Sequence, residues 1–143
     1  MELEYLIYQS KALIPDDKAA HDSILQACRI NNAGNGITGF LHREGDYFVQ
    51  YLEGSRDALN RTMRKISADT RHKDILKLDF GPLRERRLPD WQMGFVDGTQ
   101  MPLHDILESA PWGLDLKAEH PFDLVVFMTA NAHNLREDAT RAA

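Results

Sequence analysis

The chain has 143 residues, of which 43% are hydrophobic and 27% are charged, as is usual for a globular protein with one domain and a sizeable core. The net charge of -5 and the lack of a long basic run argue against direct nucleic-acid binding. A single cysteine excludes an intrachain disulfide, no stretch of ~20 apolar residues predicts a membrane span, and no signal peptide is recognised, so a cytoplasmic location is expected.

The first predicted elements are a strand and a helix. Residues 2–10 alternate in polarity as a strand does, with Tyr8 and Ser10 on one face. A helix is then expected from Lys18 to about Asn32, and residues 33–36 are predicted to form a turn. Asn is a common helix terminator, so capping is one interpretation of Asn31 and Asn32.

A hairpin follows, with strands predicted over 37–43 and 47–54 around a turn at 44–46. In the second strand, Gln50 falls between Phe48 and Leu52, on a face that should belong to the core. A buried amide without a partner costs roughly 2–7 kcal/mol. Either a neighbouring group or a ligand must therefore supply that partner.

A second helix is predicted after the N-cap Ser55, ending near Ala68, with residues 69–73 as a polar turn. Two more strands are predicted, at 74–83 and 88–96, separated by a basic and solvated loop at 84–87.

This order of elements predicts an α+β, ferredoxin-like βαββαββ sheet with two helices on one face. Residues 1–98 would form the core domain. Residues 99–135 would form a helical extension that covers the other face, and residues 136–143 a flexible tail. The apolar surface of the extension makes a homo-oligomer a hypothesis.

In a ferredoxin-like order the first and third strands are neighbours, so Tyr8 and Gln50 can share a hydrogen bond. They would lie beneath a groove between the two helices, with Ile24 and Ile66 as its walls. A flat slot with aliphatic walls and amides at one edge suits a planar heterocycle. The alternative is a satisfied polar network inside an ordinary core. The histidines are scattered, so no metal site is predicted, and Cys28 is interpreted as core rather than nucleophile.

Five segments carry a resemblance to a known family: LIYQS at 6–10, NNAGNGITGFL at 31–41, FVQYLEG at 48–54, ISADTRH at 66–72 and RLPDWQMGF at 87–95. In this order and spacing the chain resembles the BLUF domain, the blue-light sensor that uses flavin. The resemblance covers roughly the first hundred residues. It implies a photoreceptor of the short, stand-alone type, not an enzyme, that acts on an unidentified downstream protein.

The resemblance also implies a cofactor, FAD with FMN as the alternative, bound non-covalently between the helices. Tyr8 would donate an electron and a proton, and Gln50 would change its hydrogen bonds to the flavin. The other implied contacts are Ile24 and Ile66 on the ring, Asn31 and Asn32 at its edge, and Arg29, Lys65, Asp69, Arg71 and His72 towards the ribityl and phosphate end. Ser10, Trp91 and Met93 match positions of signal relay.

Two other functions are compatible with the fold. One is an acylphosphatase-like hydrolase, in which Arg29 and Asn32 would bind phosphate, although no glycine-containing phosphate loop follows the first strand. The other is a binding module without photoactivity. The colour of the purified protein separates these alternatives from a flavin photoreceptor.

Overall fold

The computed structural model describes residues 2–88 and 93–97. The expected extension at 99–135, the tail at 136–143 and Trp91 lie outside these residues. Seven elements follow one another in the described part: β1 (Leu3–Ala12), α1 (Lys18–Asn35), β2 (Thr38–Glu44), β3 (Tyr47–Ser55), α2 (Arg56–Ala68), β4 (His72–Leu83) and β5 (Gly94–Asp97).

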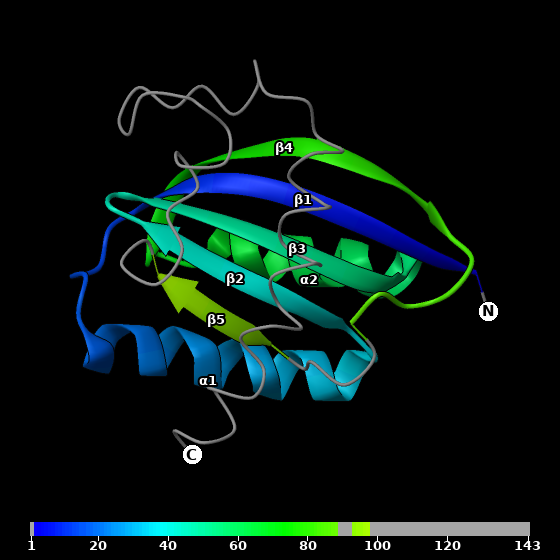
Figure 1. The fold of residues 1–143 in the computed structure, drawn as a ribbon, viewed down its shortest axis with the longest axis horizontal. Coiled ribbons are helices and arrows are strands. Elements are labelled where there is room, and N and C mark those ends of the chain that lie inside the picture. The colour runs from blue at the N-terminus through cyan, green and yellow to red at the C-terminus, as the bar shows by residue number, and fades with distance from the viewer. Residues whose placement is uncertain (1, 89–92, 98–143) are drawn as a thin grey trace.

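The five strands form one mixed sheet in the order β4-β1-β3-β2-β5, and Figure 1 shows them side by side in this order. Every pairing is antiparallel except that of β2 with the short β5, which is parallel. The predicted α+β, ferredoxin-like class is confirmed, and β1 and β3 are neighbours in the middle of the sheet as expected.

Both helices pack on one face of the sheet. Ile24 and Leu25 of α1 and Ala58 and Leu59 of α2 belong to one buried cluster with side chains of β1, β2 and β3. The sheet residues of this cluster are Leu6, Tyr8, Ala12, Leu41, Phe48 and Leu52. Since strand side chains alternate, the opposite face carries the other set, which includes Ile7, Phe40 and Tyr51.

Helix α1 ends later than the sequence indicated. The predicted end at Asn32 is wrong, because the helix runs to Asn35 and stops at Gly36, which has a left-handed backbone (φ 65°). The carbonyl of Asn32 accepts hydrogen bonds from the N–H groups of Gly36 and Ile37, which closes the helix. The Asn31 and Asn32 side chains are therefore not needed as caps.

Strand β3 runs one residue past its predicted end. Gly54 and Ser55 both pair with β1, opposite Glu4 and Leu3. A Cβ at position 54 would lie 2.8 Å from Cδ1 of Ile37 and 3.2 Å from the carbonyl oxygen of Gly36, so a larger residue would require the Ile37 side chain to move. Ser55 caps α2 as predicted, since its hydroxyl accepts from the N–H of Ala58 at 3.2 Å.

The other strand boundaries also shift. Strand β4 begins at His72 rather than at residue 74, because His72 and Lys73 pair with the end of β1. Strand β5 begins at Gly94 rather than at residue 88. The predicted solvated loop at 84–87 is wrong in its second half, where Arg86 and Arg87 hydrogen-bond to β2 and β3.

Candidate functional site

The central feature of the site is a buried hydrogen bond between neighbouring strands. The antiparallel register of β1 and β3 places Tyr8 opposite Gln50. The Tyr8 hydroxyl donates to Oε1 of Gln50, and the two residues are only 3% and 2% exposed. Burial raises the pKa of Tyr8 well above its usual value, so the phenol stays protonated. The register of β1 against β4 shifts on both sides of Tyr8 and Gln9, an irregularity typical of functional sites.

The amide nitrogen of Gln50 has a different partner. Nε2 donates to the sulfur of Met93 at 3.4 Å, and Met93 is itself 3% exposed. The backbone carbonyl of Met93 accepts from Nε and Nη2 of Arg29, at 3.3 and 3.1 Å. Gln50 therefore links Tyr8, through hydrogen bonds, to Met93, the residue directly before β5 in the segment that enters this strand.

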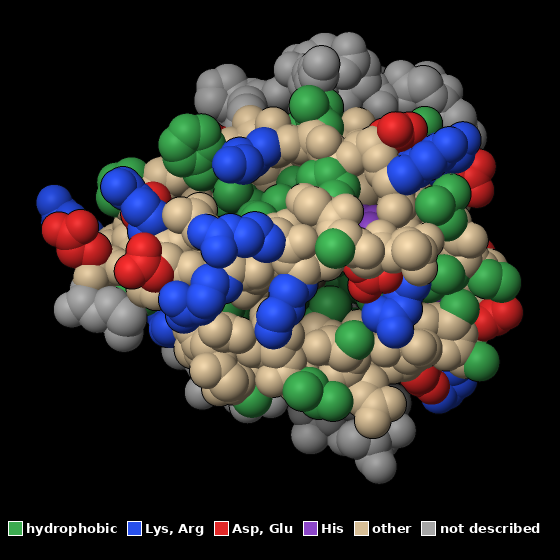
Figure 2. Space-filling model, turned by 180° about the vertical axis from the view of Figure 1, so that it is seen from behind, with side chains coloured by type: hydrophobic (Ala, Val, Ile, Leu, Met, Phe, Trp, Pro, Cys, Tyr) green, Lys and Arg blue, Asp and Glu red, His purple; other side chains and the backbone are tan. Residues whose placement is uncertain are grey.

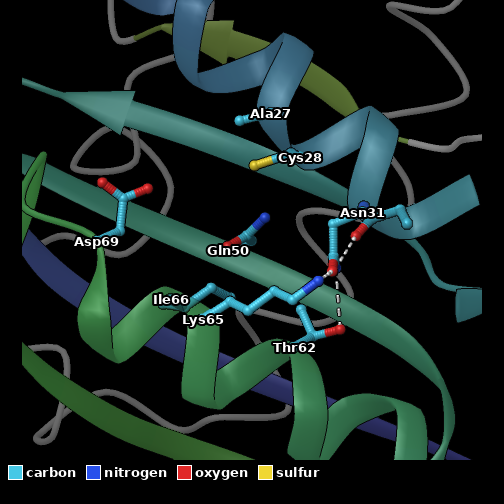
Figure 3. A pocket seen from close by; sticks show the side chains of 9 residues that line it. Ala27, Cys28, Asn31, Gln50, Thr62, Lys65, Ile66 and Asp69 are labelled. Carbon is cyan, nitrogen blue, oxygen red and sulfur yellow. Dashed lines mark hydrogen bonds between the residues drawn. The ribbon is translucent and has the colours of Figure 1, made fainter. Parts of the chain in front are cut away.

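A cavity of about 150 Å³ lies between the two helices, above Gln50. In Figure 3, Ala27, Cys28 and Asn31 reach it from α1, and Lys65 and Ile66 from α2. The nine lining residues are Ala27, Cys28, Asn31, Asn32, Gln50, Thr62, Lys65, Ile66 and Asp69. The cavity thus has walls of carbon and sulfur, with amide and hydroxyl groups gathered at one end.

Asn31 organises that polar end. Its Nδ2 donates to the Thr62 hydroxyl at 3.1 Å, and its Oδ1 accepts from Lys65 at 2.9 Å (Figure 3). Asn32 lies beside it and is 2% exposed. These contacts join α1 to α2 across the end of the cavity and hold the two amides at its edge.

The remaining predicted residues lie around the cavity rather than on its lining. Ile24 is buried in the core cluster that joins the helices to the sheet. Arg29 is turned towards Met93. Arg71 pairs with Asp69 at 3.2 Å. Their predicted roles in binding a cofactor stay predictions.

His72 and Ser10 are linked inside the protein. Nε2 of His72 lies 2.8 Å from the carbonyl of Ile66, which can only accept, so this nitrogen carries the proton. Nδ1 then accepts from the Ser10 hydroxyl at 2.7 Å. The pair ties β1 to the last turn of α2 and so fixes the wall that carries Ile66.

Sequence reasoning missed two residues of the site and did not anticipate the contact of a third with the cavity. Ala27 and Thr62 line the cavity but lack a chemical signature in the sequence. Cys28 was assigned to the core, and it is partly buried there, but it also lines the cavity. Burial raises the pKa of its thiol, which therefore stays protonated. The spacing of Thr62 and Ile66, one helical turn apart, was the available signal.

The surroundings of the cavity are rich in positive charge. Figure 2 shows Lys and Arg side chains gathered around a hollow on the face seen from behind. On α2, Arg61, Arg64 and Lys65 are exposed, and Nε of Arg61 reaches Oδ1 of Asn35 at 3.3 Å. Such a rim favours anionic groups that extend from the cavity.

Two features are absent from the residues that the structure describes: a membrane-spanning helix and a metal-binding cluster. No helix within 2–88 and 93–97 has the length and apolar content needed to cross a membrane. The same residues contain no group of three or more His, Cys, Asp or Glu side chains that could hold a metal ion.

Comparison with known families gives a match over most of the described chain. The family model described as "Sensors of blue-light using FAD" (BLUF) matches residues 3–94. Among solved structures, the dark state of the BLUF protein BlrB superposes with a TM-score of 0.78 at 37% identity, covering 94% of this chain and 98% of that one. The BLUF domain of BlrP1 gives a TM-score of 0.67 at 27% identity, covering 90% of each chain.

Curated relatives include the photoactivated adenylate cyclase subunit beta of Euglena longa, which is 33% identical over 141 residues. The beta subunit of Euglena gracilis is similar to the same degree. Each match covers 93% of this chain but only 16% of the relative. None of these comparisons supports a hydrolase of the acylphosphatase type.

Proposed function

The chain belongs to the BLUF family of flavin-based blue-light sensors, and we propose that its signal arises from the hydrogen bonds of Gln50 with Tyr8 and Met93. The observation that carries this proposal is the Tyr8–Gln50 pair, buried directly beneath the cavity between the helices. A flavin in this cavity would supply the absorption of blue light and an excited state that accepts an electron. The changes in hydrogen bonding that form the signal would be made by residues of this chain.

The cavity has the chemistry that a flavin requires. Ile66 and Ala27 offer apolar walls to a planar ring, and Asn31 and Asn32 offer amide donors and acceptors at its edge. Lys65 and its cationic neighbours on α2 suit a phosphate-bearing tail. We propose FAD as the cofactor, with the ribityl and phosphate groups towards Lys65, Asp69 and Arg71.

We propose that the amide of Gln50 carries the signal through a change of hydrogen-bond partner. The Tyr8 hydroxyl can donate or accept, so it can bond either end of the amide. The thioether of Met93 is only a weak acceptor, so it can bond the NH₂ end alone. A rotation of the Gln50 amide that exchanges the places of its oxygen and nitrogen therefore keeps a bond to Tyr8 and removes the bond to Met93. The segment that enters β5 senses that loss.

We propose that this chain turns over no substrate and that its output is a contact with another protein. The named cyclase relatives contain far more sequence than the part that matches here, so their activity is not transferred. A pull-down that compares dark and illuminated protein tests for the partner. Cyclic-nucleotide production from ATP by the purified chain in light would contradict the absence of enzymatic turnover.

Colour and difference spectroscopy test the photoreceptor mechanism. The purified or reconstituted protein should be yellow, and blue light should shift the flavin absorption reversibly to the red. Tyr8→Phe and Gln50→Leu should retain flavin and lose this shift. Tyr5→Phe is the matched control, because Tyr5 lies on the opposite face of β1 and bonds Asp79. A normal red shift in Gln50→Leu would refute the role of the amide.

Identification of the bound molecule tests the choice of FAD. The released cofactor should be FAD by mass, and titration of the flavin-free protein should give a lower Kd for FAD than for riboflavin. Equal affinities for the two would show that the cationic rim of α2 plays no part in binding.

A further inference from the structure

The most polar buried group on the far face of the sheet is the carboxylate of Glu53. It lies on β3 opposite Tyr5 of β1 and Thr38 of β2, and it is 0% exposed. It belongs to the face away from the helices, because it differs from Gln50 by an odd number of residues along the strand. Glu53 therefore cannot contact the cavity. A buried carboxylate is costly unless it is paired, so its partners indicate its role.

Both oxygens of Glu53 bind the chain that leads to Met93. Oε2 accepts from the backbone N–H of Arg87 at 2.8 Å, and Oε1 accepts from that of Leu88 at 2.6 Å. Leu88 is itself 0% exposed. Such short bonds to a charged acceptor are roughly twice as strong as neutral ones. One side chain thus fixes two successive peptide groups.

Arg86 completes the clamp from the same segment. Its Nη1 donates to the Thr38 hydroxyl at 2.9 Å and to the Glu53 carbonyl at 3.2 Å. Its Nη2 donates to the carbonyl of Gly36 at 2.6 Å. Thr38 lies directly opposite Glu53 in the pairing of β2 with β3, so Arg86 binds both strands at the place where Glu53 is buried. Residues 86–88 are held against β2, β3 and the end of α1.

Only four residues separate Leu88 from Met93, and the chain beyond Met93 is fixed as well. Gly94 pairs with Phe40 of β2, and Arg29 holds the carbonyl of Met93. The segment is therefore tied on both sides of the sulfur that accepts from Gln50.

We propose that Glu53 is a positioning residue, which sets the place of Met93 under Gln50 by clamping residues 86–88. This inference rests on the proposed role of Met93 as the acceptor that senses Gln50. Strand β3 then carries the switching amide on one face and the anchor of the responding segment on the other. Glu53, three residues after Gln50, thus anchors residues 87 and 88 to the same strand that carries the switching amide.

The test uses Glu53→Gln with Glu85→Gln as its matched control. Glutamine keeps the size of the side chain but replaces one acceptor oxygen by a donor, which faces a backbone N–H and cannot bond it. Glu85 is exposed and lies in the same loop. Thr38→Val is the milder second variant and is judged by the same criteria if Glu53→Gln does not fold. It removes the hydroxyl that accepts from Arg86 and keeps the β-branch.

The first measurement is NMR on the flavin-free protein, with labelled methionine methyl groups and amide hydrogen exchange. Glu53→Gln should shift or broaden the Met93 methyl signal, assigned with Met93→Leu, and should speed exchange at Arg87 and Leu88 by roughly tenfold or more. Glu85→Gln should change neither. Faster exchange with an unchanged Met93 signal would overturn the proposal, because Glu53 would then stabilise its own surroundings alone.

The second measurement is made on the flavin-loaded protein. Glu53→Gln should leave the flavin Kd within about twofold of the unmodified protein and change the rate of dark recovery by roughly two- to tenfold, the effect of weakening one hydrogen bond. An unchanged recovery rate would overturn the positioning role. If the unmodified protein does not photoswitch at all, the proposed function fails, whereas the Met93 signal of the flavin-free protein still decides whether Glu53 positions that residue.

Discussion

The hydrogen bond between Tyr8 and Gln50 can be measured as a free energy in the flavin-free protein. Tyr8→Phe removes the hydroxyl and leaves Oε1 of Gln50 without its donor in a place that is about as buried as the core itself. A buried acceptor without a partner costs about 1–3 kcal/mol. Against a total stability of about 5–15 kcal/mol for a domain, such a loss is readily measured.

The double variant Tyr8→Phe, Gln50→Leu distinguishes a true pair from two independent polar groups. When both partners become apolar, no buried donor or acceptor is left over, so the double variant should lose clearly less than the two single variants together. The expected coupling free energy is about 1–2 kcal/mol, within the range found for residues in contact.

Urea unfolding followed by circular dichroism provides the assay, with the slope m checked for constancy across the variants. The control cycle combines Tyr5→Phe with Gln50→Leu, since Tyr5 faces away from Gln50 and bonds Asp79. That cycle should be additive within about 0.5 kcal/mol. Additivity of the same size for Tyr8 and Gln50 would refute the buried pair on which the proposed mechanism depends.

Two further predictions concern the scaffold. Burial, followed by the hydrogen bond to Asp79 and its charge, raises the pKa of Tyr5 from 10.0 to about 12, so its contribution to stability is fully present below pH 10 and is lost as the pH rises through about 12. Unfolding free energies measured across that range should fall less in Tyr5→Phe than in the unmodified protein, because Tyr8 and Tyr51, whose pKa values are also raised by burial, still contribute to the loss in both. Equal curves would contradict the shift of Tyr5. Gly39→Ala should destabilise by more than about 2 kcal/mol, because its Cβ would lie 2.2 Å from the carbonyl oxygen of Tyr51. Gly34 lies in helix α1, and a Cβ added there would meet no neighbouring atom within 4 Å, so Gly34→Ala should stabilise the protein by about 0.5–1 kcal/mol. Thermal unfolding measures both variants, and a stabilised Gly39→Ala or a destabilised Gly34→Ala would contradict these expectations.

Local patterns in the sequence predicted the elements well where their causes are local. The Ser55 cap and the alternation of residues 47–54 depend on neighbours within a few positions, and both are found in the structure. The end of α1 was misjudged because two features competed. Asparagines favour termination, yet the chain continued to Gly36, whose left-handed backbone ends the helix more effectively.

The residues of the candidate site likewise differ in how far the sequence predicts their contacts. Tyr8 and Gln50 were predictable as neighbours because the order of strands and their alternating faces sufficed. The partners of Arg29 and His72 were not predictable in this way. One turns to the carbonyl of Met93, and the other lies inside between Ser10 and α2, contacts that span between six and 64 residues of sequence.

Sequence patterns alone indicate a glutamine on an apolar strand face, the order of the elements around it and the family to which the chain belongs. The packed fold is needed to identify the atoms that Gln50 bonds, the residues that line the cavity, and the burial of Glu53 against residues 87 and 88. The reason is physical. Periodicity and capping record the environment of a side chain within one element, whereas the partner of a buried polar group depends on distant segments that meet only when the sheet and its helices have packed.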